Sequence, residues 1–157
     1  MLVPRRREPA RPEGLAALCQ AGPVLFTNEQ IHELVPFTGF VGVNYTEITK
    51  ERVVATLEVT TERSTVGGSL HGGAQMTLAD STAAALAMAN LPEGSTGTVT
   101  IDSTTHFLGA SRSGVVTATA RALHIGRSTI VLEVDLRADS GKLIARTTQV
   151  QAVLWPK

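Results

Sequence analysis

The stretch from His71 to Pro92 reads HGGAQMTLADSTAAALAMANLP and carries one formal charge, Asp80. Small apolar residues lie on every side of a helix built from this stretch, which predicts a helix buried inside the protein. Pro92 and Gly94 mark its end. Because an unpaired buried carboxylate is costly, we expect Asp80 to be paired, neutralised or used in chemistry.

Alternating sequences on both sides of this helix predict β-strands. Before the helix, residues 39–60 alternate in two runs around a turn at 49–51, which predicts a β-hairpin. After the helix, four runs separated by short turns predict antiparallel strands at 96–108, 114–124, 128–137 and 142–154. In the third of these, apolar residues alternate with charged ones, so one face of the sheet is expected to be dry and the other wet.

The dry face of the sheet needs a cover, and the apolar helix supplies it. The predicted fold class is therefore α+β, a curved antiparallel sheet of five or six strands wrapped around one long central helix. Residues 37–157 are predicted to form this single domain. Residues 1–36 are predicted to form an N-terminal arm with short helices, because helical patterns at 14–19 and 28–34 are separated by Gly22 and Pro23.

Composition excludes several classes of function. Fourteen Lys and Arg residues balance fourteen Asp and Glu residues, so there is no basic field to attract nucleic acid. A single cysteine, Cys19, and the lack of zinc-ligand spacing among cysteines and histidines predict no metal site and a reducing, cytoplasmic location. No apolar run reaches about 18 residues, so we expect no membrane span.

The residues that open the helix are candidates for binding an oxyanion. Glycines at 67, 68, 72 and 73 permit close backbone approach, and the free N–H groups of a first helical turn favour a developing negative charge. The alternative is that Gly72 and Gly73 only let the loop pack tightly. For Asp80, the alternative role is a structural hydrogen bond to Ser81, Thr82 or a backbone N–H.

Gly72 and Asp80 are eight residues apart, roughly 12 Å along an ideal helix, which is too far for both to touch one substrate carbon. Two copies whose central helices pack side by side and antiparallel would bring the start of one helix near the middle of the other. The spacing therefore predicts a homodimer with two equivalent sites.

The combination of His71–Gly72–Gly73 at the helix start with Leu78–Ala79–Asp80 further along resembles the hotdog-fold acyl-CoA thioesterases of the PaaI-like and 4-hydroxybenzoyl-CoA thioesterase group. The resemblance covers about residues 37–155 and includes the order hairpin, helix, four strands. It implies a hotdog-fold homodimer or homotetramer that hydrolyses an aromatic or short- to medium-chain acyl-CoA. It implies no cofactor, since CoA is part of the substrate.

The resemblance also implies roles for individual residues. Asp80 would be the catalytic carboxylate, acting as a nucleophile or as a general base toward water. Gly72 would donate its N–H to the thioester oxygen, and His71 would orient the loop or contact the thioester. Thr100 matches a place where relatives carry a hydroxyl that holds the attacking water. Thr65 departs from the pattern, since relatives commonly have Asn or Gln at that position.

The turn Gly126–Arg127–Ser128 resembles the turn that meets the nucleotide end of CoA in these thioesterases, and Arg112 is a second candidate. Two other classes remain as alternatives. A non-catalytic acyl-CoA-binding protein would keep the glycine-rich helix start but would not need Asp80. A hotdog hydratase would need a histidine paired with a carboxylate, and His71 and Asp80 of one chain are out of phase on the helix for that role.

Overall fold

The computed structural model describes residues 26–156. The helical pattern at 14–19 and most of the predicted N-terminal arm lie outside this range. The elements in chain order are α1 (Asn28–Leu34), α2 (Pro36–Val41), β1 (Asn44–Ile48), β2 (Val53–Glu58), the short 3₁₀ helix η2 (Thr61–Arg63), α3 (Gly72–Ala89), β3 (Gly97–Phe107), β4 (Val115–Ile125), β5 (Thr129–Arg137) and β6 (Leu143–Leu154).

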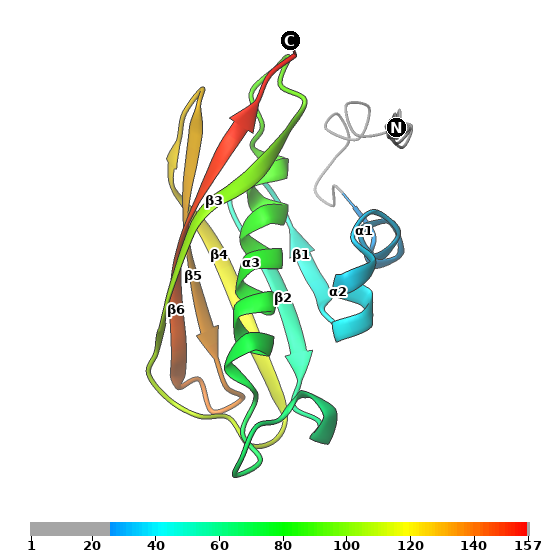
Figure 1. The fold of residues 1–157 in the computed structure, drawn as a ribbon, viewed down its shortest axis with the longest axis vertical. Coiled ribbons are helices and arrows are strands. Elements are labelled where there is room, and N and C mark those ends of the chain that lie inside the picture. Colours follow the sequence, from blue (N-terminus) through cyan, green and yellow to red (C-terminus); the bar gives the residue numbers. More distant parts are fainter. Residues whose placement is uncertain (1–25, 157) are drawn as a thin grey trace, which may run out of the picture.

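The six strands form one antiparallel sheet in the order β1-β2-β4-β5-β6-β3. The long helix α3 runs along one face of this sheet, while α1 and α2 lie beside it near β1 (Figure 1). The predicted α+β hotdog architecture is confirmed. β3 follows α3 in the chain but pairs with β6, so it forms an outer edge of the sheet.

The start of the predicted hairpin differs from the structure. Val41 ends the helix α2, and β1 begins only at Asn44. Pro36 occupies the first turn of α2, where its fixed φ suits a helix and its missing N–H costs nothing. Gly42 ends the helix with φ +85°, a left-handed conformation that glycine adopts without strain.

The core lies between α3 and the sheet. On β5, the alternate residues Ile130, Leu132, Val134 and Leu136 are fully buried, as their spacing predicts. Only one side of α3 is buried, however. Leu78 and Leu86 are inside, whereas the side that carries Asp80 is exposed. The prediction that the helix is buried on every side is wrong for the single chain.

Candidate active site

Asp80 lies in the middle of α3, on the side that faces β3 and β6. Its Oδ1 accepts two hydrogen bonds, from Thr100 Oγ1 at 3.2 Å and from Gln149 Nε2 at 2.5 Å. Its Oδ2 has no hydrogen-bond partner among residues 26–156. The carboxylate is thus anchored through one oxygen, and its other oxygen is available. Asp80 itself is exposed, whereas the sequence predicted a buried side chain.

Two buried glutamines complete this arrangement. Gln149 and Gln151 on β6 are 0% and 1% exposed. The Nε2 of Gln151 donates to Gln149 Oε1 at 2.9 Å and to Thr100 Oγ1 at 2.7 Å. Thr98 Oγ1 lies 3.0 Å from Gln151 Oε1 and 3.0 Å from the Ala152 carbonyl, and these two oxygens share its one proton as acceptors. Asp80, Thr100, Gln151 and Gln149 therefore form a closed ring of hydrogen bonds.

Gln149 and Gln151 are not among the site residues that the sequence predicts. The signal was present in the strand itself, because Thr147, Gln149 and Gln151 occupy the alternate positions that face the core. Polar residues at apolar-face positions of a strand are seldom buried without a specific hydrogen-bond partner. Identifying that partner required the pairing of β6 with β3, which places Thr100 opposite Gln151.

The start of α3 offers a free backbone donor. His71 caps the helix, and its Nδ1 accepts the N–H of Gly73 at 2.9 Å. The N–H of Gly72 has no acceptor among the described residues. A Cβ added at Gly72 would lie 3.4 Å from the ring of Phe107, so the glycine sits close beneath an aromatic side chain. The cap places the His71 side chain where the loop meets the helix.

One chain brings together only some of the predicted catalytic residues. Thr100 contacts Asp80, whereas Gly72 stands roughly 12 Å away along the helix axis. Thr65 is exposed in the loop before α3, where its carbonyl accepts the N–H of Gly68 at 3.0 Å. His71, Gly72 and Thr65 therefore lie toward the N-terminal end of the helix, apart from the carboxylate.

The turn between β4 and β5 contains Gly126, Arg127 and Ser128. The Arg127 guanidinium lies over the ring of Trp155, 5.1 Å from its centroid, and Trp155 Nε1 donates to the Arg127 carbonyl at 3.1 Å. A Cβ at Gly126 would lie 2.5 Å from His124 Nε2, so only glycine fits there without a shift. Stacking on the indole holds the arginine in place at the surface of the turn.

Arg112 does not join this turn. It lies at the opposite end of β4, roughly 35 Å away by the rise of an extended strand. Its Nε donates to the carbonyl of Gly67 at 3.3 Å, so it braces the glycine loop before α3. Within one chain, Arg112 and Arg127 cannot contact the same phosphate group.

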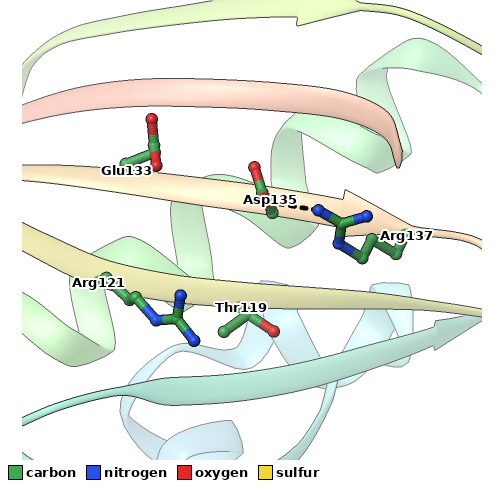
Figure 2. A pocket seen from close by; sticks show the side chains of 5 residues that line it. All are labelled: Thr119, Arg121, Glu133, Asp135 and Arg137. Atoms are coloured by element: carbon green, nitrogen blue, oxygen red, sulfur yellow. Dashed lines mark hydrogen bonds and ion pairs between the residues drawn. The ribbon is translucent and has the colours of Figure 1, made fainter. Parts of the chain in front are cut away.

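A hollow of about 280 Å³ lies on the outer face of the sheet and is lined by Thr119, Arg121, Glu133, Asp135 and Arg137 (Figure 2). Charged residues of β5 here alternate with the buried ones that face α3, so the sheet separates this hollow from Asp80. Asp135 in this hollow forms ion pairs with Arg137 and Arg146. The Arg146 guanidinium, 2.7 Å from Asp135, holds the pKa of that carboxyl below its ordinary value.

No group of three or more histidine, cysteine, aspartate or glutamate side chains within residues 26–156 is arranged to hold a metal ion. In the same part of the chain, no helix is long and apolar enough to cross a membrane.

Comparison with known proteins identifies the family. The family described as the Thioesterase superfamily matches residues 67–145, from the glycine loop through α3 to β6. The chain is 34% identical over 104 residues to a 1,4-dihydroxy-2-naphthoyl-CoA hydrolase of Listeria monocytogenes, covering 66% of this chain and 84% of that protein. The chain belongs to the thioesterase superfamily. It is an enzyme of the thioester hydrolase class.

Solved structures agree with this assignment. A thioesterase of Haemophilus influenzae superposes with a TM-score of 0.75 at 27% identity, covering 82% of this chain and 91% of that one. A hypothetical thioesterase of Streptococcus pneumoniae, solved with coenzyme A, superposes with a TM-score of 0.66 at 25% identity and covers 74% of this chain and 88% of that one.

Proposed function

We propose that this protein is an acyl-CoA thioesterase that hydrolyses an aromatic or short- to medium-chain acyl-CoA to the free acid and CoA. The observation that carries the proposal is Asp80, anchored through Oδ1 by Thr100 and Gln149 while Oδ2 stays free on the open face of α3. The similarity to a naphthoyl-CoA hydrolase and to a structure solved with coenzyme A supports a CoA thioester as the substrate.

We further propose that two copies of the chain complete each site. The outer edge of β3 pairs with no described strand, and Val99 and Ile101 on it are 48% and 60% exposed. An unpaired edge strand presents backbone N–H and C=O groups with which a strand of a second chain can pair. Antiparallel pairing of two chains through β3 and the exposed side of α3 would bring Gly72 of one copy to Asp80 of the other, in a homodimer or a homotetramer of two such dimers.

In this site, the N–H of Gly72 would stabilise the negative charge that develops on the thioester oxygen. The Oδ2 of Asp80 would either take a proton from the attacking water or add to the thioester carbon and form an anhydride that water then opens. Either route breaks the carbon–sulfur bond, releases CoA as a thiolate that takes up a proton, and leaves the acid. The Thr100 hydroxyl, which donates to the same carboxylate, would lie beside that water.

At the nucleotide end, Arg127 would bind phosphate of CoA, since its guanidinium is a permanently charged and bidentate donor. Gly126 and Ser128 would shape the turn around it. Thr65 and Arg112 lie at the loop before α3. In the dimer, these two residues of the copy that supplies Gly72 would contact the substrate. The proposed reaction uses no separate cofactor, because CoA is part of the substrate. It also uses no metal.

The test is thiol release from a panel of aromatic, short-chain and medium-chain acyl-CoAs. We expect Asp80→Asn to lower kcat by about 10²- to 10⁴-fold, the usual contribution of a positioned acid or base. The asparagine keeps the size of the side chain, so folding should be unchanged. Glu133→Gln makes the same chemical change on the outer face of the sheet and should leave kcat unaltered.

Two outcomes would contradict the proposal. Full turnover by Asp80→Asn would remove the carboxylate from the mechanism. The absence of thiol release from every member of the panel would favour an acyl-CoA-binding protein without catalysis, and formation of an enoyl or hydroxyacyl product with the thioester intact would favour a hydratase.

A further inference from the structure

We infer that Gln149 and Gln151 are positioning residues for the reaction, which orient Asp80 through a closed ring of hydrogen bonds with Thr100. This inference rests on the proposed thioesterase activity. It adds to that activity two residues that never touch the substrate themselves, since both are buried beneath α3.

The direction of every hydrogen bond in the ring follows from chemistry. An ionised carboxylate only accepts, so Gln149 must turn its NH₂ group toward Asp80 and its Oε1 toward Gln151. The NH₂ group of Gln151 then has two protons, and it gives one to Gln149 Oε1 and the other to Thr100 Oγ1. The Thr100 hydroxyl is therefore left to donate its own proton to Asp80. Both arms of the ring end on the same oxygen, Oδ1.

The ring costs stability that an apolar core would not. Burying an amide group is unfavourable unless its hydrogen bonds are made, and two aliphatic side chains would fill the same space without that demand. Both glutamines are hydrogen-bonded at the nitrogen and at the oxygen. Among the described residues, the one buried side-chain polar atom without a partner is Gln75 Oε1, in the first turn of α3. Each side-chain nitrogen and oxygen of the two glutamines therefore has at least one hydrogen-bond partner beneath the reactive carboxylate.

The consequence for Asp80 is a restricted orientation. A carboxylate on the exposed side of a helix turns freely about its terminal bond. Two donors on Oδ1, one from β3 and one from β6, hold the carboxylate plane and keep Oδ2 turned away from the ring. A reacting group held in place in this way needs no reorientation when the substrate arrives, and small misplacements of such groups cost up to about 100-fold in rate.

The experiment compares Gln149→Met and Gln149→Glu with Thr147→Val in the thiol-release assay. Methionine keeps the volume of glutamine but offers Asp80 no donor. Thr147 is the matched control, because it is buried on the same face of β6 and hydrogen-bonds to Thr105 at 2.8 Å, outside the ring. We expect Gln149→Met to lower kcat by about 10- to 100-fold with little change in KM, whereas Thr147→Val keeps the wild-type kcat.

Gln149→Glu supplies a readout that a purely structural role would not move. It places a second carboxylate against Asp80, and two carboxylates in contact cannot both be ionised. We expect the acid limb of its pH–rate profile to move to higher pH, while the profile of Thr147→Val stays in place. If Gln149→Met is unstable because it leaves one N–H of Gln151 without an acceptor, the double variant Gln149→Met/Gln151→Met removes both amides together.

The possible results separate the two proposals. A folded Gln149→Met with wild-type kcat, or an equal loss in Thr147→Val, would overturn the positioning role and leave the thioesterase activity standing. Wild-type protein that releases no thiol would overturn both. The side-chain amide protons of Gln149, followed by NMR, should shift in Asp80→Ala and not in Thr147→Val whether or not the protein is active; unmoved resonances would show that the ring does not form.

Discussion

Tyr45 links β1 to the turn of α3 that carries Asp80, and raising the pH tests that link. Its hydroxyl donates to the carbonyl of Ser81 at 3.3 Å, and the side chain is 7% exposed. Burial raises the pKa of the Tyr45 phenol to about 12 from an ordinary value of 10.0, and the nearby charge of Asp80 adds to the increase.

The size and sign of the effect follow from this pKa. A rise of the phenol pKa from 10.0 to about 12 corresponds to about 2 to 3 kcal/mol, since one unit is worth 1.36 kcal/mol. The folded protein holds the phenol proton more tightly than the unfolded chain does. This contribution to the free energy of unfolding is therefore fully present below pH 10 and is lost as the pH rises through about 12.

The assay is tyrosinate absorbance, which reports this side chain alone because Tyr45 is the single tyrosine of the chain. We expect a midpoint near 12 in the folded protein and near 10 in denaturant. Tyr45→Phe is the control. It should cost about 0.5 to 1.5 kcal/mol at neutral pH for the lost hydrogen bond and should be the more stable protein above pH 12. Tyrosinate that forms near pH 10 in a chain with native circular dichroism would refute the reasoning.

Two further predictions concern the turns. Gly67 and Gly114 have φ of +81° and +74°, but only a Cβ at Gly114 would meet a neighbour, 1.9 Å from the Asp139 carboxylate. In thermal unfolding, Gly67→Ala should cost about 1 kcal/mol for strain alone, and Gly114→Ala distinctly more; equal losses would contradict this. Trp155 is the single tryptophan, so CoA bound at Arg127 should change its fluorescence, and Arg127→Ala should raise KM without lowering kcat; unchanged fluorescence at saturating substrate would count against that turn as the CoA site.

The residue pattern was sufficient to predict the main elements. A long run of small apolar residues predicts α3 independently of how the rest of the chain folds. Strict alternation of apolar and charged residues predicts both the strand β5 and its buried face. The strand predicted from alternation was wrong at Val41, because the alternating residues Val41, Val43 and Tyr45 run across the end of α2. Short local signals at Pro36 and Gly42 decide that boundary.

The candidate site divides in the same way. Asp80 stands out in the sequence because it is the one charge in an apolar helix, and Gly72 because it opens that helix. Gln149 and Gln151 do not stand out, since they are separated from Asp80 by 69 residues or more and a glutamine in a strand has many ordinary explanations. Their role is visible only after β6 has paired with β3.

The amino-acid sequence by itself determined the helix, the strands, the wet and dry faces of the sheet and the charge that the chemistry needs. These properties depend on periodicity and composition, which act over a few residues at a time. Tertiary structure alone decided that α3 is open on the side of Asp80, that one carboxylate oxygen is held and the other free, and that Arg112 and Arg127 lie at opposite ends of β4. Those properties depend on strand order and register, which bring distant residues into contact through the packing of the whole chain.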